Sequence, residues 1–215
     1  MTDQVDTVPS SPSSPSSSSA PPRPPRPLRT LCVVGALVVA AVLGWRALQG
    51  EATVPYDDPQ SGGLLTLCGT DGEPVTGGEV DATPFAPVVL GESGVPADVD
   101  ARGAVGTVFG YQPREGVAPS EFSGAPLTAA GALVDSDRPA VEVPADAWSL
   151  ADFVTAYPAT WDGYVQLRLY LGAPGAGTLT DRPYDTADIR VEGEKWELVR
   201  GGTASCADAA SLVAP

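Results

Sequence analysis

The feature that most constrains this chain is a run of sixteen residues without a charge, from Thr30 to Trp45. As a helix this run would extend about 24 Å, and the wider segment 28–48 would extend about 31 Å, which matches a hydrocarbon core of about 30 Å. Arg29 and Arg46 lie near its two ends, where long side chains reach the lipid head groups. The sequence therefore predicts one transmembrane helix over residues 28–48, with the lipid bilayer as its partner.

The charges that flank this segment predict its orientation. Arg23, Arg26 and Arg29 precede it, whereas the chain after it turns acidic from Glu51. Because positive flanks stay in the cytoplasm, we expect a single-pass protein of the cell membrane with its N-terminus cytoplasmic and its C-terminal domain extracytoplasmic. The alternative is a signal peptide that is cleaved to release a secreted domain. An uncleaved anchor is favoured, because no small-x-small cleavage motif follows the apolar run.

Composition divides the rest of the chain into four segments. Residues 1–27 consist mainly of Ser and Pro and predict a disordered cytoplasmic tail, because they hold too little apolar surface to offset the entropy of ordering. Residues 49–63 read as a polar spacer, and residues 64–207 as one extracytoplasmic domain. Residues 208–215 are expected to form a flexible C-terminus.

Charge and residue usage exclude several classes of function. From Glu51 onward, 25 acidic residues against 8 basic ones give a formal charge of −17. Such a surface repels nucleic acid, so no nucleic-acid partner is expected. The chain contains no histidine, which removes His-based triads and His-ligated zinc. No cofactor is predicted.

The pattern after residue 64 is typical of short strands joined by turns, in keeping with 24 glycines and 23 prolines in the chain. In the clearest strand, residues 164–171, Val165 and Leu167 point to one side and Gln166 and Arg168 to the other, which predicts one buried face. Seven β-prone runs are present: 64–68, 85–90, 104–112, 140–143, 164–171, 187–191 and 195–199.

One short helix interrupts these strands. Ser149 and Asp152 have the spacing of a capping box, and Pro158 ends the helix after about two turns. The apolar residues of the helix follow its period: Leu150, Phe153, Val154 and Tyr157. Seven strands and one short helix predict a mainly β fold, an immunoglobulin-like antiparallel β-sandwich.

The three cysteines predict one disulfide bond. Cys32 lies in the apolar segment, which leaves Cys68 and Cys206 near the two ends of the outer domain. An oxidising compartment allows these two to pair.

Five motifs suggest a family. LCGTDG (67–72), TVFGYQPR (107–114), FSG (122–124), SLADFVTAYP (149–158) and WDGYVQLRLYL (161–171) occur in this order. With them the chain resembles a group of uncharacterised actinobacterial single-pass membrane-anchored surface proteins, over roughly residues 64 to 199. The resemblance implies the same placement, tail inside and domain outside, and carries over no functional residue.

Catalytic and metal-binding motifs give little signal. The sequence Gly91-Glu-Ser-Gly94 lacks the spacing of a nucleophile elbow. Loop carboxylates at Asp135 and Asp137 are candidate calcium ligands, although a solvated turn ahead of Arg138 is the favoured interpretation. Four carboxylate pairs could in principle serve hydrolysis: Asp57–Asp58, Asp98–Asp100, Asp135–Asp137 and Asp185–Asp188.

Aromatic and arginine side chains suggest a binding surface instead. Tyr111, Arg114, Trp161 and Tyr164 have the composition that is enriched at interfaces, although packing in the core is the favoured interpretation for the rings. The expected function is a membrane-tethered β-sandwich without enzymatic activity that binds a protein or envelope component at the cell surface, or serves there as a structural element. The alternative is an envelope hydrolase that uses two carboxylates.

Overall fold

The computed structural model of the protein describes residues 53–100, 102–135, 137–173 and 176–207. The predicted tail (1–27), transmembrane helix (28–48) and C-terminus (208–215) lie outside these residues, as does the start of the predicted spacer. Within the described residues, none of the helices has the length and apolar character needed to span a bilayer.

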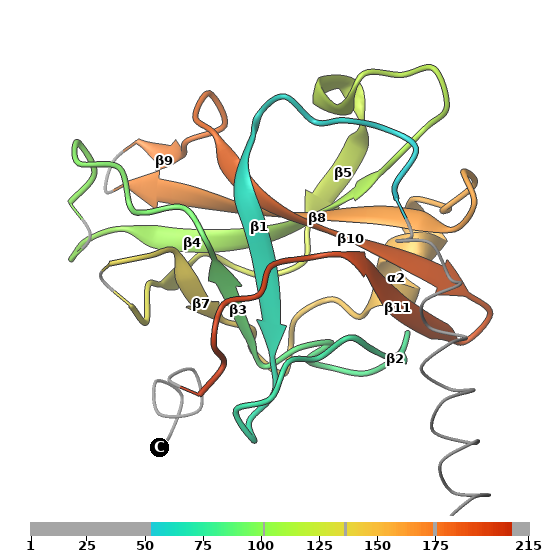
Figure 1. The fold of residues 1–215 in the computed structure, drawn as a ribbon, viewed down its shortest axis with the longest axis horizontal. Coiled ribbons are helices and arrows are strands. Elements are labelled where there is room, and N and C mark those ends of the chain that lie inside the picture. The colour runs from blue at the N-terminus through green and yellow to red at the C-terminus, as the bar shows by residue number, and fades with distance from the viewer. Residues whose placement is uncertain (1–52, 101, 136, 174–175, 208–215) are drawn as a thin grey trace, which may run out of the picture. The chain divides into compact units, whose positions relative to one another are not determined.

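The described residues form one sheet of 11 strands and one short α-helix (Figure 1). This confirms a mainly β fold with one helix, and each of the seven predicted strands is present. The elements are β1 (Ser61–Cys68), β2 (Gly77–Glu79), β3 (Val88–Gly91), β4 (Val105–Gln112), the 3-10 turn η1 (Pro119–Glu121), β5 (Ser123–Pro126), β6 (Gly131–Ala132), β7 (Ala140–Glu142), α2 (Leu150–Ala156), β8 (Tyr164–Ala173), β9 (Gly177–Thr178), β10 (Tyr184–Glu192) and β11 (Lys195–Arg200).

Strand β1 joins two parts of the sheet, whose main order is β5-β4-β8-β10-β1-β3-β7. Its first half pairs in parallel with β10, and its second half pairs antiparallel with β3. In Figure 1, β1 runs across the direction of β8 and β10. The arrangement is consistent with a β-sandwich. The expectation of purely antiparallel pairing is wrong at β1, because this strand enters the sheet beside β10 before it reaches β3.

The core lies on the apolar face of β8. Val165 and Leu167 are fully buried, and so are Ala187 and Ile189 on the neighbouring β10. This confirms the predicted inward face of residues 164–171. The helix adds Leu150 and Phe153, both fully buried in the same cluster.

The predicted capping box fixes the start of α2. The Ser149 hydroxyl accepts a hydrogen bond from the Asp152 backbone at 3.0 Å, and the Asp152 carboxylate accepts one from the Ser149 backbone at 3.2 Å. Two of the orphan N–H groups at the helix start are thereby satisfied. The helix then holds the ring of Phe153 against Gly110 of β4.

Replacing Gly110 by alanine is expected to destabilise the domain by about 1–3 kcal/mol, the usual range for overpacking. A Cβ atom at this position would lie 2.8–3.0 Å from three ring atoms of Phe153, which is fully buried and cannot move aside. Denaturant unfolding measures the effect. Gly131→Ala is the matched control, because no atom lies within 4 Å of its Cβ position. A Gly110 variant as stable as the Gly131 variant would contradict this packing.

The second face of β8 is buried as well, which corrects the prediction of one buried face. Gln166, Arg168 and Tyr170 are 0%, 2% and 4% exposed. Residues 53–60, hereafter the N-terminal strap, cover this face together with the chain around η1: Asp58 pairs with Arg168, and the Pro119 carbonyl accepts a hydrogen bond from it. The alternating pattern identifies two faces of a strand but not what covers each of them.

The folded part also begins earlier than the sequence suggests. Strand β1 starts at Ser61, so the predicted boundary between spacer and domain at residues 63 and 64 falls inside a strand. Tyr56 and Asp58, expected in a polar spacer, make contacts with buried groups of the sheet.

Candidate functional site

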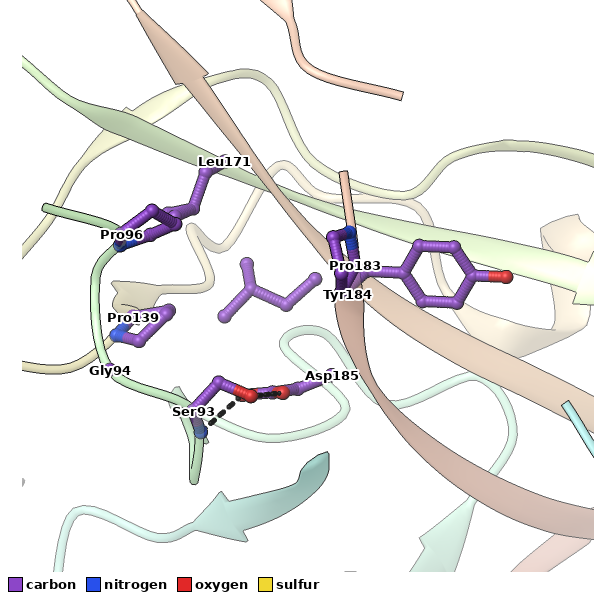
Figure 2. Close-up of a pocket in the computed structure, with 9 residues that line it drawn as sticks. Ser93, Gly94, Pro96, Pro139, Leu171, Pro183, Tyr184 and Asp185 are labelled. Atoms are coloured by element: carbon purple, nitrogen blue, oxygen red, sulfur yellow. Dashed lines mark hydrogen bonds between the residues drawn. The ribbon is translucent and has the colours of Figure 1, made fainter. Parts of the chain in front are cut away.

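A small pocket opens where β10, the end of β8 and the loop after β3 meet (Figure 2). Its volume is about 130 Å³. Most of its walls are apolar, with three prolines at positions 96, 139 and 183 and two leucines at positions 169 and 171. Ser93 and Asp185 provide its polar edge, as Figure 2 shows.

Asp185 lies at this edge because of its position in the paired strands β1, β10 and β8. It lies on β10 between Gly63 of β1 and Leu169 of β8, and is 2% exposed. Its carboxylate accepts hydrogen bonds from the Ser93 backbone N–H, at 3.0 Å, and from the Ser93 hydroxyl. Two positions that are 92 residues apart in the chain are thereby joined.

Glycines in the neighbouring strands leave the space that this carboxylate occupies. A Cβ atom on Gly63 would lie 2.8 Å from Asp185 Oδ1 and 2.9 Å from Ser93 Oγ. A Cβ atom on Gly91 would overlap Asp185 Oδ2. The segment Gly91-Glu-Ser-Gly94, which fails as a nucleophile elbow, therefore serves to seat a buried carboxylate.

Burial raises the pKa of Asp185, and the negative charge of Glu92 acts in the same direction. The hydrogen bonds from Ser93 oppose this shift. Their donors favour the ionised form, whereas desolvation penalises it. The pocket thus presents an acidic group that a ligand with positive charge would stabilise in its ionised form.

A second polar cluster, the Arg168 cluster, lies under the N-terminal strap. It consists of Tyr56, Asp58, Tyr111, Gln166, Arg168, Tyr170, Tyr184, Asp188 and Arg200. The guanidinium of Arg168 lies 3.9 Å from the ring centroid of Tyr111 and 4.6 Å from that of Tyr184. It also lies 3.5 Å from Asp58 and donates to Gln166 at 2.7 Å.

Asp188 anchors the other end of the Arg168 cluster. It is fully buried and accepts hydrogen bonds from the Tyr56 hydroxyl and from Arg200 Nε, the latter at 2.7 Å. Burial raises the pKa of Asp188, and the charge of Arg200 opposes this shift. Burial likewise raises the pKa of Tyr56. Every charge in the Arg168 cluster has a protein partner. We therefore interpret the cluster as structural, because it fastens the N-terminal strap to β8 and β10.

Of the four predicted surface residues, one belongs to the Arg168 cluster and one lies beside it. Tyr111 stacks on Arg168, and the ring of Trp161 lies 5.7 Å from that of Tyr56. Arg114 instead donates to the Glu121 carbonyl at 2.9 Å, and the Tyr164 backbone donates to the Trp161 carbonyl at 3.0 Å. All four are partly buried. A binding surface on these residues stays a prediction.

Of the four carboxylate pairs, Asp185–Asp188 is separated by the geometry of its strand. Asp185 and Asp188 lie on opposite faces of β10, because they are an odd number of residues apart. Asp98 forms an exposed ion pair with Arg182 at 2.6 Å. Among the described residues that line the pocket, Asp185 is the only acidic one.

The calcium candidates lie in a turn in which protein donors already bind the carboxylate oxygens of Asp135. Asp135 accepts hydrogen bonds from the Asp137 backbone at 2.8 Å and from Arg138 at 3.0 Å, and these donors lower its pKa. Arg138 thus supplies the positive charge that a cation would supply. Within the described residues, no group of three or more acidic or cysteine side chains is placed to hold a metal ion.

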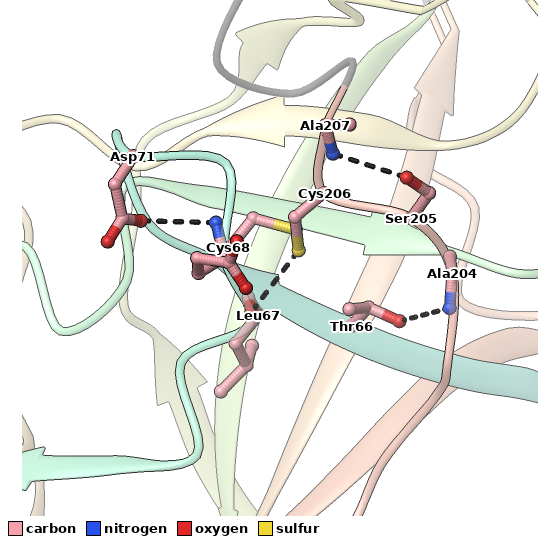
Figure 3. The surroundings of a disulfide bond; sticks show 9 residues. Thr66, Leu67, Cys68, Asp71, Ala204, Ser205, Cys206 and Ala207 are labelled. Atoms are coloured by element: carbon pink, nitrogen blue, oxygen red, sulfur yellow. Dashed lines mark hydrogen bonds between the residues drawn. A yellow bond between two sulfur atoms is a disulfide. The ribbon is translucent and has the colours of Figure 1, made fainter.

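The structure contains the predicted disulfide bond between Cys68 and Cys206, with Cα atoms 5.5 Å apart (Figure 3). Both cysteines are buried in a small apolar cluster with Val88 and Leu90 of β3. The chain before Cys206 lies along β1, since the Ala204 backbone donates to Thr66 Oγ1 at 3.0 Å. The bond therefore joins the end of β1 to a tail that already contacts this strand.

Comparisons with protein-family models, with curated proteins and with solved structures find no match. The resemblance to actinobacterial surface proteins accordingly stays a prediction, and the site is interpreted from its own chemistry.

Proposed function

We propose that this protein is a membrane-tethered extracytoplasmic binding module without catalytic activity. The observation that carries the proposal is the pocket beside Asp185, in which apolar walls surround one buried acidic group. A concave apolar site with a few convergent polar groups is the usual form of a binding site. The partner is a component outside the cell, met by the domain while residues 28–48 hold it at the membrane.

Two observations support the placement. The buried Cys68–Cys206 bond is of the kind that persists in oxidising compartments. The apolar segment 28–48 follows three arginines and precedes an acidic domain, as the positive-inside rule requires for this orientation.

We also propose that the sheet curls as an immunoglobulin-like sandwich, with β1 as the strand that passes from one layer to the other. If the anchor is cleaved, the same domain would act as a secreted protein.

The hydrolase alternative is not favoured by any specific observation. Glycoside hydrolysis requires two carboxyl groups that converge on one cleft, whereas the described lining of the pocket supplies one. Ser93 donates its hydroxyl to Asp185, and a chain without histidine offers no imidazole base to activate it.

Protease treatment of intact cells tests the proposed placement. With a tag on each terminus, we expect external protease to remove the C-terminal tag while the N-terminal tag stays protected in the membrane fraction. In the same samples, alkylation under denaturing conditions before reduction is expected to leave Cys68 and Cys206 unlabelled. A C-terminal tag that is digested only after lysis, together with two labelled cysteines, would overturn the proposal. An N-terminal tag missing from the membrane would favour the secreted form.

A further inference from the structure

Among the buried carboxylates of the described residues, Asp185 differs in having no cationic partner. Asp58 pairs with Arg168, and Asp188 pairs with Arg200. In the described part of the chain, no salt bridge joins Asp185 to a lysine or arginine. Buried charges in proteins are normally paired, so the carboxylate without a counter-ion, at the edge of a pocket, is the one placed to receive a cation from outside.

We propose that this pocket binds a primary ammonium group on a short alkyl chain, such as a lysine-like side chain presented by a larger partner. The inference rests on the proposed function as a binding module and names the chemistry that its site recognises. Three features of the pocket carry it: the acceptor capacity of Asp185, the character of the walls, and the size of the cavity.

The acceptor capacity leaves room for one more donor. An ionised carboxylate offers about four lone-pair sites. Ser93 supplies two donors to Asp185, from its backbone and from its hydroxyl, so acceptor sites on the carboxylate remain. An ammonium group, which has three N–H donors and full charge, can complete this set with a charge-assisted hydrogen bond.

The walls suit an alkyl chain. Pro96 and Leu171 lie on the side of the cavity away from the carboxylate, and Pro139 lies between Pro96 and Ser93, as Figure 2 shows. Long cationic side chains bury their methylene stems on such surfaces while the charged end finds a polar partner. The described lining of the pocket holds Asp185 and neither lysine nor arginine, so the site does not suit an anion.

The size favours one side chain over a complete ligand. The volume of about 130 Å³ is below the range of roughly 300–1,000 Å³ that is usual for small-molecule sites. The pocket therefore takes an anchor group, and the rest of the partner lies outside it. The charge of −17 over residues 51–215 attracts basic partners at long range and raises their rate of association.

Three probes of equal length test the inference: n-butylammonium, 1-butanol and butyrate. They are titrated against the full chain in lipid nanodiscs, with binding followed by ligand-observed NMR. We expect saturable binding of butylammonium in the millimolar range, at least tenfold tighter than that of butanol, and no binding of butyrate. Equal binding of butanol and butylammonium, or no saturable binding of butylammonium, would overturn it.

Asp185→Asn assigns the binding to this carboxylate. The substitution keeps the shape of the side chain and removes its charge, so the affinity for butylammonium should fall at least tenfold while that for butanol changes less than about twofold. Asp146→Asn, at an exposed position, is the matched control for net charge and should leave both affinities unchanged. An Asp185 variant that binds butylammonium as the wild type does would refute the assignment.

A second variant guards against misfolding of the first. Leu171 is only partly buried, so Leu171→Phe should fold and narrow the pocket, and both butylammonium and butanol should bind more weakly. Unchanged binding by this variant would place the probes elsewhere and overturn the inference. Failure of the proposed placement looks different, because a domain found in the cytoplasm would still bind butylammonium with the same preference.

Discussion

Replacing Asp58 by asparagine is expected to lower the free energy of unfolding by about 3–5 kcal/mol, the usual cost of breaking a buried ion pair from one side. The side chains of Asp58 and Arg168 are 1% and 3% exposed. Without Asp58, the charge of Arg168 would keep only neutral partners: two tyrosine rings, Gln166, Tyr170 and the Pro119 carbonyl. The Tyr184 hydroxyl, which donates to Asp58 at 2.9 Å, would exchange a carboxylate acceptor for the weaker amide oxygen of asparagine.

The control for this prediction is an exposed ion pair of similar length. Lys195 and Glu79 are 3.5 Å apart, with side chains 76% and 56% exposed. Glu79→Gln should change the free energy of unfolding by less than about 1 kcal/mol, because solvent screens such pairs. Denaturant titration of both variants measures the difference. Equal, small effects would mean that Arg168 is stabilised by its aromatic neighbours and not by Asp58.

A double variant separates the two explanations. Asp58→Asn combined with Arg168→Met removes both charges, and the loss of stability should be clearly smaller than the sum of the two single losses, since no unpaired charge stays buried. Additive losses would contradict the coupling between the N-terminal strap and β8. If the coupling holds, the N-terminal strap is part of the folded domain and not of a spacer.

The sequence predicts those elements of this fold that depend on local pattern. The alternation in residues 164–171 identifies β8 and its core face, and the spacing of Ser149 and Asp152 identifies the start of α2. Both follow from the period of a single element. The missed strands are β2, β5, β6 and β9, which have two to four residues each and consist mostly of glycine and other small residues. Such strands form because they pair with a neighbouring strand, and not because their own residues have a high β-propensity.

The candidate site could not be predicted for a related reason. Ser93 and Asp185 are 92 residues apart, and the sequence points to Asp185 only as a partner of Asp188 and not of Ser93. The glycines at positions 62, 63 and 91 signal a close approach, but the sequence does not say which side chain approaches. The burial of Arg168 was missed in the same way, because its cover includes Asp58, 110 residues earlier in the chain.

The second large effect is expected from the disulfide bond. Replacing both cysteines in a Cys68→Ala/Cys206→Ala variant should lower the free energy of unfolding by about 2–4 kcal/mol. The enclosed loop spans 138 residues, for which the loss of chain entropy sets a ceiling of about 5 kcal/mol. The native state should change little, because the Gly202 backbone still donates to the Leu65 carbonyl at 2.8 Å and Ala204 to Thr66.

The denaturant dependence distinguishes this mechanism from a simple loss of packing. Without the cross-link the unfolded chain exposes more surface, so the slope of unfolding free energy against denaturant should increase as the midpoint falls. Cys32→Ala, which removes the third cysteine, is the control and should leave the unfolding of the domain unchanged. A loss of unfolding free energy below about 1 kcal/mol, with an unchanged denaturant slope, would mean that hydrogen bonds alone keep the tail on β1. The disulfide would then contribute little to stability, and its support for an extracytoplasmic domain would rest on the cysteines being oxidised in cells.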